Sequence, residues 1–534
     1  MINKYLLIGI FCLLFVLNIQ AEEGMWLLSQ LPDLNLAEEG FQITAEEIYS
    51  SGKPSLSDAI VWLGGCSASF VSPDGLILTN HHCAYGALQR NSAKDGVDYI
   101  TDGFLAGSKE KELPAIGQYA FVLKSMADVT DVILKSVKGI EDLTEKEKKI
   151  EQMITDMEKE AENDREDRYC YIATNYNGKQ YVKYLFNKYQ DVRIVFAPPS
   201  AIGNYGGDVD NWMWPRHTGD FTYLRVYQAP DGSGAKYSLE NIPVKSPNYL
   251  KMARSDLKPD DITFILGFPG GTMRYRSSYS VDWNLNRNYI PSVKRFQSIL
   301  DVITQLSEEN PDAKLKLASY DSGINNTMKN YQGNIDGMQK SGFIENKQRF
   351  ENELMSFINS KRKLKNQFGD VIENIAAQYA ILEENFDYDE ALKNFGGYTS
   401  GVLYNLAAKA YEVARERAKP ESERRPEFSE KRVKESIDKI DYAHLRVYEP
   451  FEKIMMIRAL NQAASLPEEQ RITELDYILR GSDSIEDWMD HTFTKTGLKD
   501  ADYAKELYNK TAAEMESLDD PVIDLAIKLY GPKD

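Results

Sequence analysis

The amino-acid sequence predicts a mixed β and α protein with a β-rich domain over residues 22–279 and a large all-helical domain over residues 280–534. Up to about Tyr275, short apolar runs alternate with Gly, Pro and Asp turns, which is typical of β-strands. Beyond about Ser280 glycines become rare, and Lys, Glu, Ala, Leu and Ile recur every three to four residues as far as Tyr530. That spacing indicates amphipathic helices.

The first 21 residues have the pattern of a secretory signal peptide. Lys4 supplies positive charge, residues 5–17 are apolar, and the segment ends at Ala21 before an acidic start. We therefore expect cleavage after Ala21 and a periplasmic or secreted protein, in a compartment where disulfides form. No later apolar run is long enough to cross a bilayer.

Residues 66–83 predict a β-hairpin. Cys66, Ala68 and Phe70 alternate with polar positions, residues 73–75 (Pro-Asp-Gly) form a turn, and an apolar run follows over residues 76–79. The second strand of this hairpin delivers two adjacent histidines at its end.

Cys66 and Cys83 lie close enough in sequence to join the two ends of this hairpin behind His81 and His82, which leaves Cys170 unpaired. Closing a loop of this size stabilises a protein by roughly 3 kcal/mol in the chain-entropy model. A histidine followed directly by a cysteine, after an apolar strand and a cysteine that can pair with it, resembles the catalytic base of trypsin-like serine peptidases.

Further elements follow from local periodicity. Residues 140–168 predict a solvated amphipathic helix, because they are rich in Glu and Lys with apolar residues at helical spacing. Strands are expected at residues 181–186, 192–196, 221–227 and 262–267, and helix breaks near residues 310–311, 396–397 and 419–420.

Charge and motif content exclude several classes of function. The formal net charge of −19 argues against nucleic acid or an anionic membrane as a partner. The sequence has no His-Glu-x-x-His, no Cys-x-x-Cys and no phosphate-binding or dinucleotide-binding glycine motif, so we predict neither a cofactor nor a metal. A zinc site from His81, His82 and His217 is disfavoured, because adjacent histidines at a strand end point apart.

The chemistry of serine peptidases requires a histidine base, a carboxylate that orients it, a nucleophilic serine and oxyanion donors. Asp208, Asp210 and Asp220 are the candidate carboxylates near the loop over residues 198–220. Asp220 directly precedes a β-prone run, from which a rigid sheet can hold a carboxylate against an imidazole, and we pair it with His82. Asp208 and Asp210 lie in a Gly-rich loop and are expected to shape that loop.

Three long motifs carry a more specific resemblance. They are GGCSASFVSPDGLILTNHHC over residues 64–83, GDVDNWMWPRHTGDF over residues 207–221 and GFPGGTMRY over residues 267–275. With residues 23–26 (EGMW) and 326–333 (NTMKNYQG), they resemble the bacterial dipeptidyl-peptidase 7 and dipeptidyl-peptidase 11 family of periplasmic serine exopeptidases. The likeness extends from the signal peptide to the last residue.

The resemblance implies a chymotrypsin-like double β-barrel, with the helical domain inserted between the barrels. It also implies Ser-His-Asp acyl transfer that releases N-terminal dipeptides from peptides with a free N-terminus, and it allows a homodimer. By position, His82 is similar to the family's base and Asp220 to its orienting acid. Asn211, Trp212 and Asn326 match residues that hold the substrate's α-amino group, a role that suits asparagine carbonyls and an aromatic wall.

The nucleophile is where this sequence departs from the family. In the family the serine lies in the second barrel, after the helical domain, in a Gly-Asn-Ser-Gly-Ser-Pro-like loop, and this sequence contains no such loop. We therefore expect that the second barrel is missing and that this chain alone is inactive. Ser233, between two glycines, is disfavoured as nucleophile because it lies in a polar turn. The choice between acidic and hydrophobic substrate side chains stays open, because the residue that sets it also lies in the second barrel.

Two alternatives belong to other classes. A non-catalytic periplasmic protein that keeps the amine-binding residues would bind peptides without cleaving them. A trypsin-like endopeptidase is disfavoured, because the helical insert and the amine clamp would obstruct cleavage within a chain.

Overall fold

The computed structural model describes residues 25–534, except 39, 208, 211, 212, 214, 260, 272–275, 421, 422, 481, 482 and 534. The predicted signal peptide, residues 1–21, lies outside the described residues. The chain forms two compact units. One comprises Met1–Ser57 and Ala253–Ile265, and the other Asp58–Met252 and Leu266–Asp534.

The first unit contains the short helices η1 (Leu28–Asp33) and α2 (Ala45–Ile48). Thr44 caps α2, because its hydroxyl accepts a hydrogen bond from the backbone amide of Glu47. The rings of Phe41 and Phe264 pack 5.6 Å apart between centroids.

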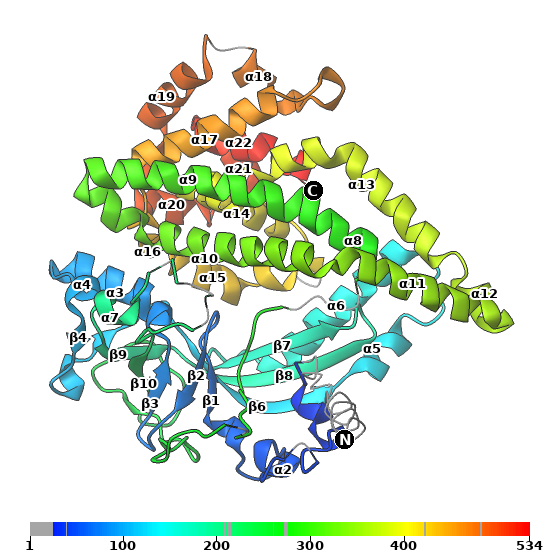
Figure 1. Ribbon diagram of the computed structural model, residues 1–534. Coiled ribbons are helices and arrows are strands. Elements are labelled where there is room, and N and C mark those ends of the chain that lie inside the picture. The colour runs from blue at the N-terminus through cyan, green and yellow to red at the C-terminus, as the bar shows by residue number, and fades with distance from the viewer. Residues whose placement is uncertain are drawn as a thin grey trace, which may run out of the picture. The chain divides into compact units, whose positions relative to one another are not determined.

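The second unit contains an antiparallel sheet of eleven strands, in the order β4-β9-β10-β3-β2-β1-β6-β8-β7, with β11 paired to β10 and β5 to β9 (Figure 1). The strands are β1 (Ile60–Trp62), β2 (Ser67–Phe70), β3 (Leu76–Thr79), β4 (Phe104–Leu105), β5 (Leu113–Pro114), β6 (Ala120–Asp128), β7 (Arg168–Asn175), β8 (Gln180–Tyr189), β9 (Asp191–Ala197), β10 (Thr222–Gln228) and β11 (Ile242–Pro243). Buried side chains including Phe70, Ile77, Ile194 and Leu224 form its core. The alternation predicted for the hairpin is present, since Ala68 and Phe70 are buried and their neighbours Ser67 and Ser69 are half-buried.

Most strand predictions in this region are confirmed, since β8 and β9 contain the runs expected at residues 181–186 and 192–196, and β10 contains the run expected at 221–227 except its first residue, Phe221. The strand expected at residues 262–267 is wrong. No strand is assigned there, and Ile262, Phe264 and Ile265 are exposed. An apolar run forms a strand only where a neighbouring strand satisfies its backbone groups, and local sequence does not reveal that neighbour.

A helix in the β-rich region was not predicted. Helix α3 (His81–Asp95) follows β3 directly and buries Ala84, Ala87 and Leu88 at helical spacing against the core of the sheet. The other helices here are α4 (Tyr99–Asp102), α5 (Thr130–Ser136), α6 (Leu143–Glu162) and α7 (Ser200–Gly203). The helix expected at residues 140–168 is α6, and its last predicted residue already belongs to β7.

From Ser278 onward the described chain is helical, as predicted. The helices are α8 (Ser278–Trp283), α9 (Ile290–Glu309), α10 (Pro311–Ser341), α11 (Phe343–Ser360), α12 (Arg362–Phe368), α13 (Val371–Lys393), α14 (Gly401–Arg417), α15 (Glu430–Ile437), α16 (Ile440–His444), α17 (Glu449–Ala464), α18 (Asp476–Leu479), α19 (Ile485–Lys495), α20 (Ala501–Leu507), α21 (Ala512–Glu516), α22 (Pro521–Lys528) and α23 (Tyr530–Lys533). All three expected breaks are present, at the ends of α9, α13 and α14. Within the described residues, no helix has both the length and the apolar character needed to cross a membrane.

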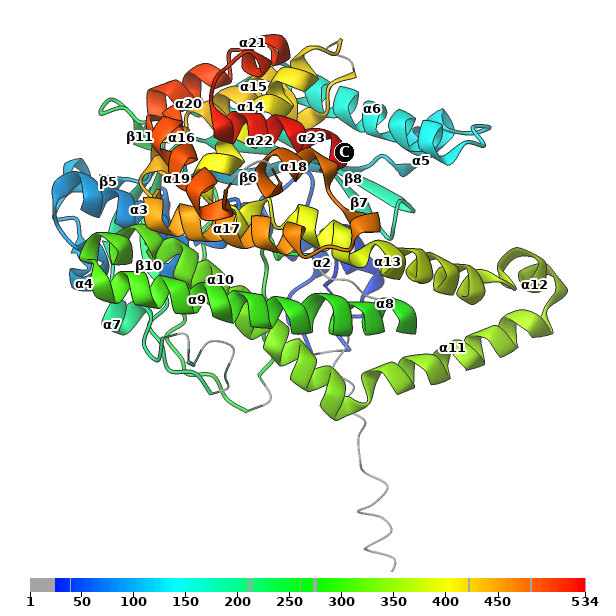
Figure 2. The same ribbon diagram turned by 90° about the horizontal axis from the view of Figure 1, so that it is seen from above.

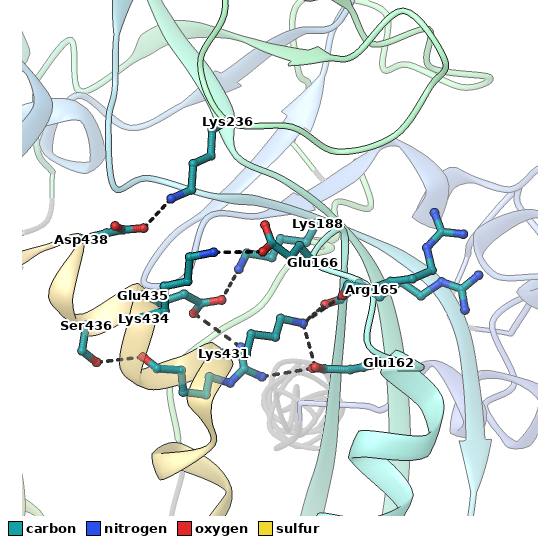
Figure 3. Close-up of polar contacts among 12 residues, drawn as sticks. Glu162, Arg165, Glu166, Lys188, Lys236, Lys431, Lys434, Glu435, Ser436 and Asp438 are labelled. Carbon is teal, nitrogen blue, oxygen red and sulfur yellow. Dashed lines mark hydrogen bonds and ion pairs between the residues drawn. The ribbon is translucent and has the colours of Figure 1, made fainter. Parts of the chain in front are cut away.

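Helix α15 joins the helical segment to the sheet through ion pairs with α6, β8 and their loops (Figure 3). Lys188 of β8 is buried, and its ammonium contacts the Glu435 carboxylate. Glu162 at the end of α6 accepts from Lys431 at 2.7 Å and from Arg432 at 3.2 Å. Helix α10 makes a second junction, where Gln89 of α3 donates a hydrogen bond to the Leu315 carbonyl.

Candidate active site

His82 lies at the junction between strand β3 and helix α3. β3 ends at Thr79, Asn80 occupies the N-cap position, and α3 begins with His81. Successive residues of a helix point about 100° apart. Consequently His81 is buried while the side chain of His82 is 62% exposed.

Asp220 contacts His82 through both carboxylate oxygens. The His82 Nδ1 lies 3.0 Å from Oδ2 of Asp220, and the His82 backbone amide donates to Oδ1 at 3.1 Å. The Asn80 side-chain amide donates to Oδ2 and to the backbone carbonyl of Asp220, both at 3.1 Å. Asn80 was missed in the sequence analysis, although an asparagine directly before the two histidines is a common helix-capping signal.

Strand register brings these residues together across 138 positions of sequence. In the antiparallel pair of β10 and β3, Thr222 lies opposite Thr79. Asp220 lies two residues before β10 and His82 three residues after β3, so the pairing places both at the same end of the two strands. The sheet therefore holds the carboxylate against the imidazole.

The electrostatics of the pair favour an ionised carboxylate. Burial by itself raises the pKa of Asp220, but the hydrogen bond from the His82 ring, its charge and the backbone amides of His82 and His81 outweigh it, so the pKa is lowered. A carboxylate accepts hydrogen bonds only, so Asp220 selects the His82 tautomer that carries its proton on Nδ1, and in that tautomer Nε2 is a proton acceptor. The arrangement can thus perform general base catalysis.

His81 has different surroundings. Its ring is buried, which lowers its pKa, and it donates to the backbone carbonyl of Pro198. A Cβ at Gly203 would lie 2.5 Å from Cγ of His81, so only glycine fits there. His81 therefore packs α7 and the residues just before it against α3.

The structure joins Cys66 and Cys83, with the Sγ atoms 2.07 Å apart. The bond ties the residue before β2 to the first turn of α3, directly beside His82. The two sulfurs and a ring nitrogen of His82 lie within 4.8 Å of one another. Sulfurs in a disulfide are not thiolates, however, so this group does not fit a metal. Cys170 is a free, buried thiol, and burial raises its pKa to about 12.

The residues assigned to the substrate amine are only partly described. Asn211 and Trp212 lie outside the described residues, as does Asp208. Asn326 is exposed on α10, the helix whose N-terminal half packs against α3. Asp210 lies in the turn formed by Gly206, whose φ of +78° and close approach to the Asp210 carboxylate require glycine.

Ser233 is far from the histidine. The seven residues of β10 separate its turn from Asp220, a distance of about 23 Å for an extended strand. The Ser233 hydroxyl instead donates to Asp231 at 2.6 Å. This geometry agrees with the interpretation of Ser233 as a turn residue.

A family model described as peptidase S46 matches residues 21–533. The chain belongs to the peptidase S46 family. It is 31% identical over 518 residues to an Asp/Glu-specific dipeptidyl-peptidase of Shewanella putrefaciens, covering 96% of this chain and 69% of that protein. It is also 37% identical over 378 residues to dipeptidyl-peptidase 7 of Capnocytophaga gingivalis, covering 70% of this chain and 52% of the relative.

Solved structures share the fold. A crystal structure of Porphyromonas endodontalis DPP11 in complex with the dipeptide Arg-Glu matches with a TM-score of 0.77 at 24% identity, covering 96% of this chain and 73% of that chain. The same protein in complex with substrate matches with a TM-score of 0.72. The family resemblance and the mixed α/β fold are therefore confirmed. The chain spans between about half and two thirds of the curated relatives that it matches, 52% and 69% for the two named above.

Proposed function

We propose that this chain carries the catalytic base and the orienting acid of a serine dipeptidyl peptidase, which releases N-terminal dipeptides from oligopeptides. The main support is the contact between His82 Nδ1 and Asp220 Oδ2 at 3.0 Å. Membership of the peptidase S46 family suggests the reaction in which this pair takes part, because curated relatives are named dipeptidyl-peptidases.

In the proposed reaction, Nε2 of His82 takes the proton of a serine hydroxyl as that oxygen attacks the scissile carbonyl. The peptide C–N bond then breaks, the same proton passes to the leaving amine, and a dipeptidyl ester remains on the serine. Water attacks this ester with His82 again acting as base. Asp220 holds the imidazole in one tautomer and stabilises its charged form. The proposal places the serine outside these 534 residues, since the sequence contains no loop like the family's Gly-Asn-Ser-Gly-Ser-Pro and Ser233 lies in a turn beyond the far end of β10.

The finer architecture belongs to the same proposal. Strands β3 and β10, which flank the site, would belong to the first of two chymotrypsin-like barrels, and the second barrel would carry the serine. Asn211, Trp212 and Asn326 would hold the substrate's α-amino group, so that only the second peptide bond reaches the serine. The exposed position of Asn326 on α10 is consistent with that role.

We also propose that residues 1–21 are a signal peptide and that the protein acts in the periplasm or outside the cell. The disulfide beside His82 supports an oxidising compartment.

The decisive experiment compares two proteins on fluorogenic dipeptide substrates. One is the entire natural reading frame that contains this chain, and the other is the 22–534 fragment. We expect the first to release dipeptides, the fragment to be inactive, and N-acetylated substrates to resist cleavage. His82→Ala should lower turnover by roughly 10⁴-fold or more, whereas the control His491→Ala, at an exposed position of α19, should not.

Two outcomes would contradict the proposal. Hydrolysis by the fragment that is abolished by Ser233→Ala would assign the nucleophile to the turn after β10. Binding of dipeptides without hydrolysis by the entire reading frame would support the peptide-binding alternative.

A further inference from the structure

The side chain of Asn80 does not cap the helix that follows it. Asn80 is the N-cap residue of α3 and has extended backbone angles, but its side chain accepts no hydrogen bond from the first turn, residues 81–84, all of which the structure describes. Asn310, the N-cap residue of α10, shows the usual arrangement, since its side-chain oxygen accepts from the backbone amide of Asp312 at 2.9 Å. The Asn80 side chain is therefore held by a different contact.

The Asp220 carboxylate takes the capping position at the start of α3. Helix α3 and strand β10, which Asp220 precedes, lie close together in both views (Figures 1 and 2). Oδ1 of Asp220 accepts from the backbone amide of His82, the second residue of the helix, at 3.1 Å. An N-cap side chain normally accepts from the amide of the second or third helical residue. Asp220 thus caps α3 from outside the helix, with its negative charge at the helix N-terminus, where it is stabilised.

The Asn80 amide is turned toward Asp220 instead. Its Nδ2 donates at 3.1 Å to Oδ2 of Asp220 and at 3.1 Å to the Asp220 backbone carbonyl. An ionised carboxylate and a carbonyl only accept hydrogen bonds, so the amide nitrogen of Asn80, rather than its oxygen, faces them. Oδ2 is also the oxygen that lies 3.0 Å from Nδ1 of His82. Asn80 therefore holds both the main chain and the side chain of the residue that orients the imidazole.

The residue type at position 80 follows from this contact. Asn, Asp and Ser are about equally good N-cap residues, so capping alone would not select asparagine. An aspartate would offer no N–H and would place a second negative charge beside Asp220. A serine has a shorter side chain and a single O–H, so it cannot donate to two acceptors as the NH₂ group of Asn80 does. Asparagine is the N-cap residue that supplies two donors.

We propose that Asn80 is a positioning residue of the candidate active site, which holds the Asp220 carboxylate in the orientation that fixes the His82 tautomer. Asn80 acts through Asp220 and not on the substrate. This inference rests on the proposed function, in which His82 is the general base, and it adds a residue to which that function assigns no part.

Kinetics of the entire natural reading frame on dipeptide substrates test the proposal. Asn80 is exposed, and Asn80→Asp and Asn80→Ser keep a good N-cap residue, so thermal stability should change little. Asn80→Ser should lower kcat by about tenfold and Asn80→Asp by about a hundredfold, because each removes hydrogen bonds to a charged group and the second adds repulsion. KM should change little, because Asn80 does not bind substrate. Asn310→Asp makes the same substitution at the N-cap of α10 and should change neither constant.

The pH dependence of kcat/KM separates positioning from a merely structural role. Asn80→Asp adds a negative charge near the imidazole, so the His82 ring keeps its proton to higher pH. The acid limb of the profile should therefore move up by roughly one pH unit. Burial lowers the pKa of the neighbouring His81, so that residue stays neutral over this range. The acid limb of Asn310→Asp should stay where it is in the native enzyme.

Parallel measurements on Asp220→Asn separate a failure of this inference from a failure of the proposed function. If Asp220→Asn lowers turnover and Asn80→Asp has native kinetics, Asn80 has no positioning role and the proposed function stands. A loss of activity in Asn80→Asp that comes with lower thermal stability and an unmoved acid limb also overturns the inference. If the native reading frame is inactive, or Asp220→Asn leaves turnover unchanged, the proposed function fails and the inference fails with it.

Discussion

Removing the carboxylate of Glu435 should destabilise the protein strongly, because it leaves the Lys188 ammonium buried without its counter-ion. Lys188 is 1% exposed, and burial lowers its pKa while Glu435 opposes that effect. The nearby charges of Lys431 and Arg432 add repulsion. Breaking a buried pair from one side costs about 3–5 kcal/mol, so we expect Glu435→Leu to lower the free energy of unfolding by that amount in urea titrations.

A second ion pair of α15 provides the control. Lys434 and Glu166 lie 3.2 Å apart, but both side chains are 62% exposed, so Glu166→Leu should cost only about 0–1 kcal/mol. Lys188→Met combined with Glu435→Leu should recover most of the loss, because no buried charge remains.

The pH dependence distinguishes electrostatics from lost packing. In Glu435→Leu the folded protein holds the Lys188 proton less tightly than the unfolded chain does, so stability should rise with pH as Lys188 loses its proton. The reasoning would be refuted if Glu435→Leu and Glu166→Leu lowered the free energy of unfolding equally. It would also be refuted if the destabilisation caused by Glu435→Leu did not change with pH.

Three other predictions follow from the site and the helical core. In the entire reading frame, Asp220→Asn should lower dipeptide turnover by about 10⁴-fold with little change in thermal stability, because the imidazole loses its orienting charge; unchanged kinetics would remove Asp220 from the site. A non-reduced digest analysed by mass spectrometry should contain linked Cys66 and Cys83 peptides, and replacing both residues by serine should cost roughly 3 kcal/mol in urea; two free thiols would disprove the bond. Burial raises the pKa of Glu452 from 4.5 to about 7, so the folded state binds this proton more tightly than the unfolded chain does. The free energy of unfolding should therefore fall by about 3 kcal/mol as pH rises from 4.5 to 7. A Glu452→Gln variant whose stability has the same pH dependence as that of the native chain would contradict this.

The local spacing of apolar residues predicted the strands and helices that bury one side against the core. Alternation in β2 and three-to-four spacing after Ser278 report which side of an element is apolar, and proline and glycine mark where a helix ends. Helix α3 was missed because its helical spacing, at Ala84, Ala87 and Leu88, follows immediately after a strand. The apolar run at residues 262–267 has the composition of a strand, but composition does not supply the partner that a strand requires.

Both the sequence and the tertiary structure were needed to define the candidate site. The sequence by itself determined the residue types, the family motifs, the helical segment and the position of His82 at the end of an apolar strand. The sequence also proposed Asp220 as the partner of His82, but only the tertiary structure shows the contact between them, because the register between β10 and β3 joins segments that lie more than a hundred residues apart. The tertiary structure also decided that Lys188 and Glu435 meet, 247 positions apart. Contacts of this kind arise from the packing of whole elements, and the local spacing of side chains carries no record of it.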